Sequence, residues 1–214
     1  MALFLDSADL TEIRAAMDLG IYAGVTTNPT LLSSVPPAEM FDHLGEIAKV
    51  CRKSLYLQAS GRTPEELERH ALTCLEVAPG RTVLKIPMTA GGLKLCGSLS
   101  GRNIPVCVTA LFSPLQVYAA ALAGAHSAAV YLGRITRSGG DGVKVIEQAV
   151  RMLAQNGLAT RVLAASIPDE AALAAVLSIP GVDVTIPFRL QDALIKHPGT
   201  DEALESFRQA PKRS

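Results

Sequence analysis

The stretch VLKIP, residues 83–87, places one charged side chain, Lys85, inside a short apolar run. Seven other short runs rich in β-branched or apolar residues lie along the chain, and none is long enough to form a helix. With residues 83–86 they predict eight strands, at residues 3–5, 24–26, 55–58, 83–86, 106–110, 128–132, 161–165 and 183–186.

The segments between these runs carry helix signals. Residues 63–66, TPEE, form a capping box with proline at the first helical position, and Pro36 and Pro37 precede another helix. Gly20, Gly124 and Gly157 each close a helical pattern, where glycine adopts the left-handed conformation that ends a helix. The alternation predicts parallel strands covered by helices.

Eight strand–helix units without a long linker favour a closed α/β barrel. We expect a single (β/α)8 TIM barrel formed by residues 1–214, with an additional C-terminal helix over residues 200–211, where Leu204 and Phe207 have helical spacing. The alternative is an open flavodoxin-like or Rossmann-like sheet. An open sheet of this kind would be expected to have a G-x-G-x-x-G sequence after its first strand, and this chain has none there.

The overall composition excludes several classes of partner. Hydrophobic residues make up 49% of the chain, charged residues 19%, and the formal net charge is zero, so no basic surface is expected to hold nucleic acid or a membrane. The four cysteines form no C-x-x-C pair and the N-terminus does not resemble a signal peptide, which predicts a reduced, cytoplasmic protein. The four histidines have no metal-ligand spacing, so we expect chemistry without a metal or cofactor.

Barrel enzymes place their chemistry at the C-terminal ends of the strands. Polar residues that end or closely follow the predicted strands are therefore expected to meet in one central pocket. They are Asp6, Thr26, Thr27, Asn28, Gln58, Lys85, Thr109, Tyr131 and Ser166.

Two of these residues have both a catalytic and a structural interpretation. The apolar neighbours of Lys85 would desolvate its side chain, which favours the neutral amine that attacks a carbonyl. Alternatively, Lys85 reaches the strand end and pairs with Asp6 or another carboxylate. Asp6 is either an acid/base group or the N-cap of the following helix.

Several segments together resemble the transaldolase superfamily, in its short-chain branch closest to fructose-6-phosphate aldolase. They include FLDSA at residues 4–8, GVTTNPTLL at 24–32, VLKIPMTAGGL at 83–93, VTALFS at 108–113 and YLGRI at 131–135. The match continues through GGDG at 139–142, LAASI at 163–167 and TIPF at 185–188. It spans nearly the whole chain in order.

The resemblance implies a class I aldolase in which Lys85 forms a Schiff base with a ketose phosphate. Asp6 would accept the C4 hydroxyl proton during cleavage, Asn28 would bind the donor hydroxyl groups, and Thr26 would support that strand end. Thr27 is expected to be a neighbour rather than a contact.

The resemblance also bears on the fate of the three-carbon unit. Transaldolases usually have glutamate, asparagine, serine and phenylalanine at the positions of Gln58, Cys107, Ala129 and Tyr131. Fructose-6-phosphate aldolase has glutamine and tyrosine at the first and last of these positions. Gln58, Thr109 and Tyr131 would then hold the water that releases dihydroxyacetone, unless Tyr131 is only a core aromatic. The alternative is a transaldolase that transfers this unit.

At the other end of the substrate, Arg134 and Ser166 match phosphate-binding positions of the family, unless Arg134 forms only an ion pair at the rim. Relatives usually carry a second basic residue two positions after the serine, where this chain has Pro168. Arg137 and Arg189 are candidate substitutes. The resemblance further implies a homo-oligomer, a pentamer or decamer, in which the C-terminal helix clasps a partner. A barrel that binds sugar phosphates without catalysis is the rival of another class.

Overall fold

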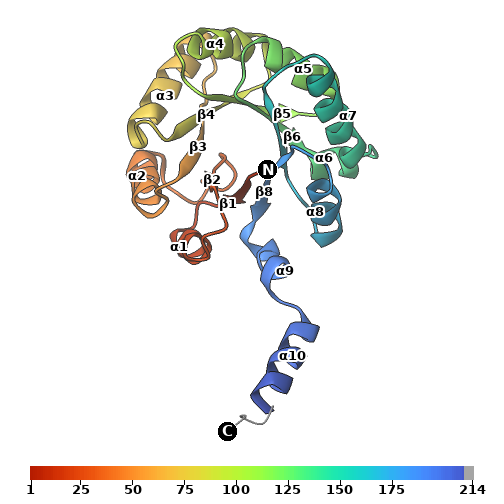
Figure 1. Cartoon of the computed structure of the whole chain (residues 1–214). Helices are drawn as coiled ribbons and strands as arrows, with labels where there is room; N and C mark the ends of the chain where they lie inside the picture. Colours follow the sequence, from red (N-terminus) through yellow and green to blue (C-terminus); the bar gives the residue numbers. More distant parts are fainter. Residues whose placement is uncertain (210–214) are drawn as a thin grey trace.

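Eight parallel strands form a closed ring in the computed structural model, which describes residues 1–209 (Figure 1). Each strand pairs with the next along the chain, and β8 pairs with β1. The fold is therefore the predicted (β/α)8 barrel and not an open sheet. The strands are β1 (Leu3–Asp6), β2 (Gly24–Thr26), β3 (Ser54–Gln58), β4 (Thr82–Pro87), β5 (Val106–Leu111), β6 (Ser127–Tyr131), β7 (Arg161–Ala165) and β8 (Asp183–Pro187).

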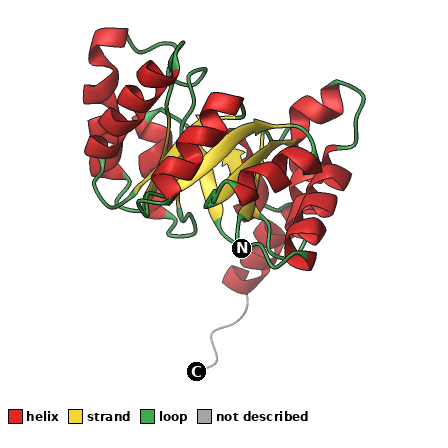
Figure 2. Cartoon of the chain, turned by 90° about the horizontal axis from the view of Figure 1, so that it is seen from above, coloured by secondary structure: helices red, strands yellow, loops and turns green. Residues whose placement is uncertain are grey.

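Helices surround this ring, and Figure 2, turned by 90° from the view of Figure 1, shows them on both sides of the strands. They are α1 (Leu10–Asp18), α2 (Met40–Val50), α3 (Pro64–Val77), α4 (Ala90–Ser100), α5 (Pro114–Leu122), α6 (Leu132–Arg137), α7 (Gly142–Gln155), α8 (Glu170–Leu177), α9 (Asp192–Ile195) and α10 (Pro198–Gln209), with short 3-10 turns η1 (Pro37–Glu39) and η2 (Phe188–Leu190).

The predicted helix boundaries agree with the observed chemistry at the caps. The Thr63 hydroxyl accepts a hydrogen bond from the Glu66 amide at 3.2 Å. The Glu66 carboxylate bonds to the amide of Arg62 instead of that of Thr63, so only half of the capping box forms. Gly20 and Gly124 have positive φ angles of 74° and 81°, as expected for residues that end helices.

One predicted strand is displaced along the chain. Residues 128–132 were expected to be extended, but β6 ends at Tyr131 and Leu132 begins α6. Leu132 is buried within this short helix. The apolar run therefore continues from the strand into the helix, and its end does not show where the strand ends.

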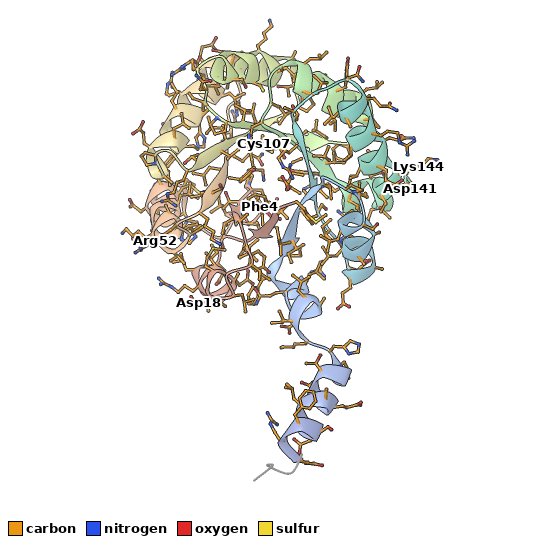
Figure 3. The ribbon with its side chains drawn as sticks, in the orientation of Figure 1. Phe4, Asp18, Arg52, Cys107, Asp141 and Lys144 are labelled. Carbon is orange, nitrogen blue, oxygen red and sulfur yellow. The ribbon has the colours of Figure 1, made fainter. Side chains whose placement is uncertain are left out.

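Alternation along the strands divides the barrel interior into two layers. The lower layer is mostly apolar: Phe4 packs edge-on against Tyr56 with ring centroids 5.0 Å apart, and Val83, Cys107 and Leu163 belong to the same buried cluster. Figure 3 shows Phe4 and Cys107 inside the ring of strands. Two residues further along their strands, Asp6, Gln58, Lys85 and Thr109 form part of the upper layer, above this apolar floor.

A partly buried ion pair connects two strands at the opposite end of the barrel. Arg161 at the start of β7 donates to both carboxylate oxygens of Asp183 at the start of β8. Asp183 also accepts from the amide of Ala2 at 2.6 Å. The Asp183 side chain is only 7% exposed, whereas that of Arg161 is 39% exposed. The carboxylate therefore joins the N-terminal segment to the two strands.

Replacing Asp183 with alanine is expected to lower the free energy of unfolding by about 2 kcal/mol, because it removes hydrogen bonds to a cation and to the partly buried amide of Ala2. For a chain of this length that corresponds to a fall in Tm of roughly 4–8 °C. Differential scanning calorimetry measures it. The matched control is Asp192→Ala, which removes the exposed pair with Lys196 and is expected to cost less than about 1 kcal/mol. Equal losses from both variants would contradict the role of Asp183.

The predicted additional C-terminal helix is present as α10, which projects away from the barrel (Figure 1). It begins at Pro198, and residues 210 and 211 of the predicted range lie outside the described residues. Leu204 is 46% exposed and Phe207 is 71% exposed. The clasping of a partner and the homo-oligomer stay predictions. Among residues 1–209, no helix is both long and apolar enough to cross a membrane.

Candidate active site

A pocket of about 430 Å³ lies at the C-terminal end of the barrel strands. Its wall includes eight of the residues singled out from the sequence: Asp6, Thr26, Asn28, Gln58, Lys85, Tyr131, Arg134 and Ser166. Thr109 lies directly behind this wall and is fully buried. Since the upper-layer positions of neighbouring strands face one another, the closure of the barrel brings these side chains together.

Lys85 belongs to the upper layer of the barrel interior and is only 5% exposed. Its amine donates to the backbone carbonyl of Thr27 at 2.7 Å. None of the ion pairs formed within residues 1–209 includes Lys85, so the expectation of a carboxylate partner is wrong for this part of the chain. The amine faces the pocket, and no carboxylate of residues 1–209 forms an ion pair with it.

Asp6 lies at the end of β1 and lines the same pocket. One carboxylate oxygen, Oδ1, accepts from the Thr26 hydroxyl at 2.7 Å and from the Asn28 amide at 3.5 Å. The N-cap of α1 is Asp9, which accepts from the amides of Thr11 and Glu12. The interpretation of Asp6 as the helix cap is therefore wrong.

The loop after β2 fixes the orientation of Asn28. Its side-chain carbonyl accepts from the amides of Thr30 and Leu31 at 3.0 and 3.1 Å. Both acceptor bonds go to the loop, so the amide NH2 is directed toward Asp6 and the pocket. Thr27 is fully buried and its hydroxyl donates to the carbonyl of Tyr56, which keeps this side chain out of the pocket.

A second group of polar side chains lies across the pocket. The Thr109 hydroxyl donates to the Tyr131 hydroxyl at 3.1 Å. The buried Oε1 of Gln58 has no hydrogen-bond partner among the described residues. Tyr131 is also packed edge-on against Phe112, with ring centroids 5.9 Å apart. The Tyr131 hydroxyl thus bonds to a side chain at the pocket and not to a loop carbonyl.

Arg134 is the cation at the rim of the pocket. It is exposed, and its guanidinium carbon lies 4.7 Å from the centre of the Tyr131 ring, a cation–π contact. None of the ion pairs found in the described part of the chain uses it. The expectation of a rim ion pair is wrong for those residues, and the charge stays available to an anionic ligand.

Ser166 follows β7 in a left-handed conformation, with φ of 61°. Its carbonyl accepts from the amide of Gly133 at 2.9 Å. A Cβ added to Gly133 would lie 2.3 Å from that carbonyl oxygen, so only glycine permits the two segments to approach this closely. The serine is therefore held beside the start of α6, where Arg134 is located.

Two charged residues, Asp169 and Arg189, lie next to this rim. The N-terminus of α8 is capped by the carboxylate of Asp169, which accepts from Ala172 at 2.8 Å. Arg189 donates to the carbonyl of Pro168 at 2.7 Å. Neither Arg189 nor Arg137 lines the pocket.

Cys107 lies on β5 beside Lys85 on β4 and is completely buried in the apolar floor. Burial raises the pKa of the Cys107 thiol. The side chain is therefore a protonated filler of the barrel interior and not a nucleophile.

Two residues of the wall, Thr185 and Ala110, bear on the geometry of the pocket although the sequence motifs assign them no role. Thr185 lies on β8, and its hydroxyl is 2.7 Å from that of Thr26. Thr185 could have been found from the alternation along the strand, since it stands two positions after Asp183 and so faces the barrel interior as well. Ala110 has a positive φ of 63° where the pairing of β5 with β6 shifts register. No feature of the sequence indicated that bulge.

Comparison with known proteins shows which family the chain resembles. Residues 3–213 match the family Transaldolase/Fructose-6-phosphate aldolase. The chain is 39% identical over 210 residues to a "Probable transaldolase" of Moorella thermoacetica, with 97% of this chain and 95% of the relative covered. Proteins of the same name from Chlorobium phaeobacteroides and Thermoplasma volcanium are 36% and 37% identical, each over 97% of this chain, with 96% and 93% of their own lengths covered. The chain belongs to the transaldolase/fructose-6-phosphate aldolase family.

Proposed function

We propose that this protein is a class I aldolase that cleaves a ketose phosphate, such as fructose 6-phosphate, reversibly to dihydroxyacetone and glyceraldehyde 3-phosphate. The observation that carries the proposal is the buried amine of Lys85, which faces the same pocket as the carboxylate of Asp6 and has no anionic partner in the described chain. A nucleophilic amine and a general base are the two groups that this reaction requires.

In the cleavage direction, the Lys85 amine attacks the C2 carbonyl of the ketose, and loss of water gives an iminium ion. Asp6 then accepts the proton of the C4 hydroxyl. As the C4 carbonyl forms, the C3–C4 bond breaks and its electron pair moves into the iminium, which becomes an enamine. The aldehyde leaves, while Asn28 and the Thr26 side of the pocket hold the hydroxyl groups of the three-carbon unit.

The second half of the reaction returns the free enzyme. Protonation of the enamine at C3 regenerates an iminium, and water adds to its carbon. Breakdown of the resulting carbinolamine releases dihydroxyacetone and the Lys85 amine. We assign the positioning of this water to Gln58, Thr109 and Tyr131, because the hydroxyl pair and the unpartnered Gln58 oxygen supply donors and an acceptor at the pocket.

The second candidate function is transaldolase, in which an aldose phosphate replaces water and takes the enamine. The names of the relatives from Moorella, Chlorobium and Thermoplasma favour it. The polar group around Tyr131 favours release, since these side chains can hold water beside the iminium. Both functions use Lys85 and Asp6 in the same way.

Incubation with fructose 6-phosphate alone separates the two functions. A lyase converts it to free dihydroxyacetone at many turnovers per active site, without any acceptor. A transaldolase stops after about one turnover and resumes when erythrose 4-phosphate is added. Substrate binding with neither activity and with no borohydride-trapped adduct would favour the non-catalytic barrel.

We assign the phosphate of the aldehyde to Arg134 and Ser166, because arginine forms charge-assisted contacts with phosphate oxygens. This chain has Pro168 where relatives usually have a basic residue, and the neighbouring Asp169 caps α8. The phosphate end of the pocket therefore lacks one of the cations expected there. A hydrogen bond to a charged group contributes roughly 1.5–3 kcal/mol, so its loss weakens selection for phosphate by about tenfold to a hundredfold. Unphosphorylated aldehydes are therefore comparatively good acceptors of dihydroxyacetone.

Replacing Pro168 with lysine is expected to raise the preference for glyceraldehyde 3-phosphate over glyceraldehyde by about tenfold. The measurement is the ratio of kcat/KM for the two aldehydes in the aldol direction. Pro168→Gln is the matched control, which removes proline without adding charge. A parent ratio already in the thousands, unchanged by the lysine, would contradict this account of the phosphate end.

A further inference from the structure

Three side chains on adjacent strands form a continuous row of hydrogen bonds in the wall of the pocket. The Thr185 hydroxyl on β8 lies 2.7 Å from the Thr26 hydroxyl on β2, and Thr26 lies 2.7 Å from Oδ1 of Asp6 on β1. Strand β1 lies between the other two strands in the barrel. Thr185 is 3% exposed and Thr26 is fully buried, so solvent does not compete for these bonds.

The direction of the row follows from the chemistry of its end. An ionised carboxylate only accepts hydrogen bonds, so the single hydroxyl proton of Thr26 is donated to Asp6. The bond between the two threonines then has Thr185 as donor and Thr26 as acceptor. Both bonds therefore point toward the carboxylate, and each strengthens the other in a buried setting.

This row leaves the two oxygens of Asp6 in different surroundings. Oδ1 is held by Thr26 and, more weakly, by the Asn28 amide at 3.5 Å. No hydrogen bond to Oδ2 is formed within residues 1–209. Since Asp6 lines the pocket, Oδ2 is the oxygen available to a substrate hydroxyl.

We propose that Thr185 is a positioning residue for Asp6: through Thr26 it fixes the carboxylate with Oδ2 directed at the hydroxyl that loses its proton. The proposal rests on the proposed aldolase function, in which Asp6 is the general base. Thr185 acts on the proton transfer and not on the Lys85 amine, which bonds to the carbonyl of Thr27 instead. Loss of the Thr185 hydroxyl should therefore slow C3–C4 cleavage more than it weakens substrate binding.

The test compares Thr185→Val with Thr185→Ser. Valine has nearly the same shape as threonine but no donor, whereas serine keeps the hydroxyl. We expect Thr185→Val to lower kcat for cleavage of fructose 6-phosphate by about tenfold, the scale of one lost hydrogen bond, with KM changed less than about twofold. Thr185→Ser should recover most of kcat. Should valine prevent folding, Thr185→Cys, whose thiol is a weak donor, is expected to lower kcat in the same way.

The matched control is Thr82→Val on β4. Thr82 is equally buried at 3% and donates to the carbonyl of Ala78 at 3.1 Å, away from the pocket. It should leave kcat within about twofold of the parent. Full activity of Thr185→Val, or an equal loss in Thr185→Ser, would overturn the positioning role.

Borohydride trapping with dihydroxyacetone separates this inference from the function on which it rests. Thr185→Val should still form the adduct at Lys85 while its cleavage is slow. If the parent forms the adduct and Thr185→Val cleaves at the parent rate, only the role of Thr185 is wrong. If the parent shows neither adduct nor cleavage, the proposed function is wrong and the role of Thr185 is overturned with it.

Discussion

Replacing Lys85 with methionine is expected to lower kcat for fructose 6-phosphate cleavage by more than about 10⁴-fold, because no covalent intermediate can form without the amine. Methionine fills a similar volume without a polar head. The side chain is 5% exposed and lies over the apolar floor of the barrel, so the fold should persist. Steady-state kinetics and circular dichroism measure the two effects.

The matched control for this prediction is Lys94→Met. Lys94 is an exposed residue of α4 that does not line the pocket, and its removal should leave kcat near that of the parent. A dihydroxyacetone adduct on Lys85→Met protein would place the nucleophile elsewhere, with Lys94 as the next candidate.

The double change Tyr131→Phe and Gln58→Glu is expected to lower release of dihydroxyacetone relative to transfer by roughly 10²-fold, the scale of a positioned proton-transfer group. Phenylalanine removes the hydroxyl that accepts from Thr109. Glutamate introduces the carboxylate that the resemblance assigns to transaldolases. The measurement is the rate of dihydroxyacetone formation from fructose 6-phosphate, with and without erythrose 4-phosphate.

The single variant Tyr131→Phe should already slow release, because the phenyl ring retains the contact with Phe112 but binds no water. Adduct formation at Lys85 should continue in both variants. A double variant that releases dihydroxyacetone as readily as the parent would show that Tyr131 does not hold the water.

The barrel was predictable because its strands are short, apolar and regularly spaced. Every predicted strand is present, with each end within one residue of the observed one. Misplaced boundaries, as at Leu132, arise where an apolar run passes from a strand into a helix that is also buried. The apolar spacing predicted the helix α10 but not the direction in which it projects, because none of its described residues is buried.

The meeting of the candidate residues in one pocket followed from the rule that polar groups at the C-terminal ends of barrel strands face a common centre. The rule does not predict which of these side chains form hydrogen bonds with one another. Whether Lys85 pairs with Asp6 depends on distances across the barrel, and the structure instead gives each its own partner, Thr27 for the amine and Thr26 for the carboxylate. The alternation along β8 predicts that Thr185 faces the barrel interior. Thr185 lies two residues before the end of that strand, however, and candidates were expected only at the strand ends.

The proposed reaction depends on a covalent intermediate between Lys85 and the ketose. The most direct measurement is the intact mass of the protein after incubation with dihydroxyacetone and borohydride, followed by peptide mapping. We expect a gain of one reduced dihydroxyacetone unit per chain, located on Lys85. An unchanged mass, or an adduct located on another lysine, would contradict it.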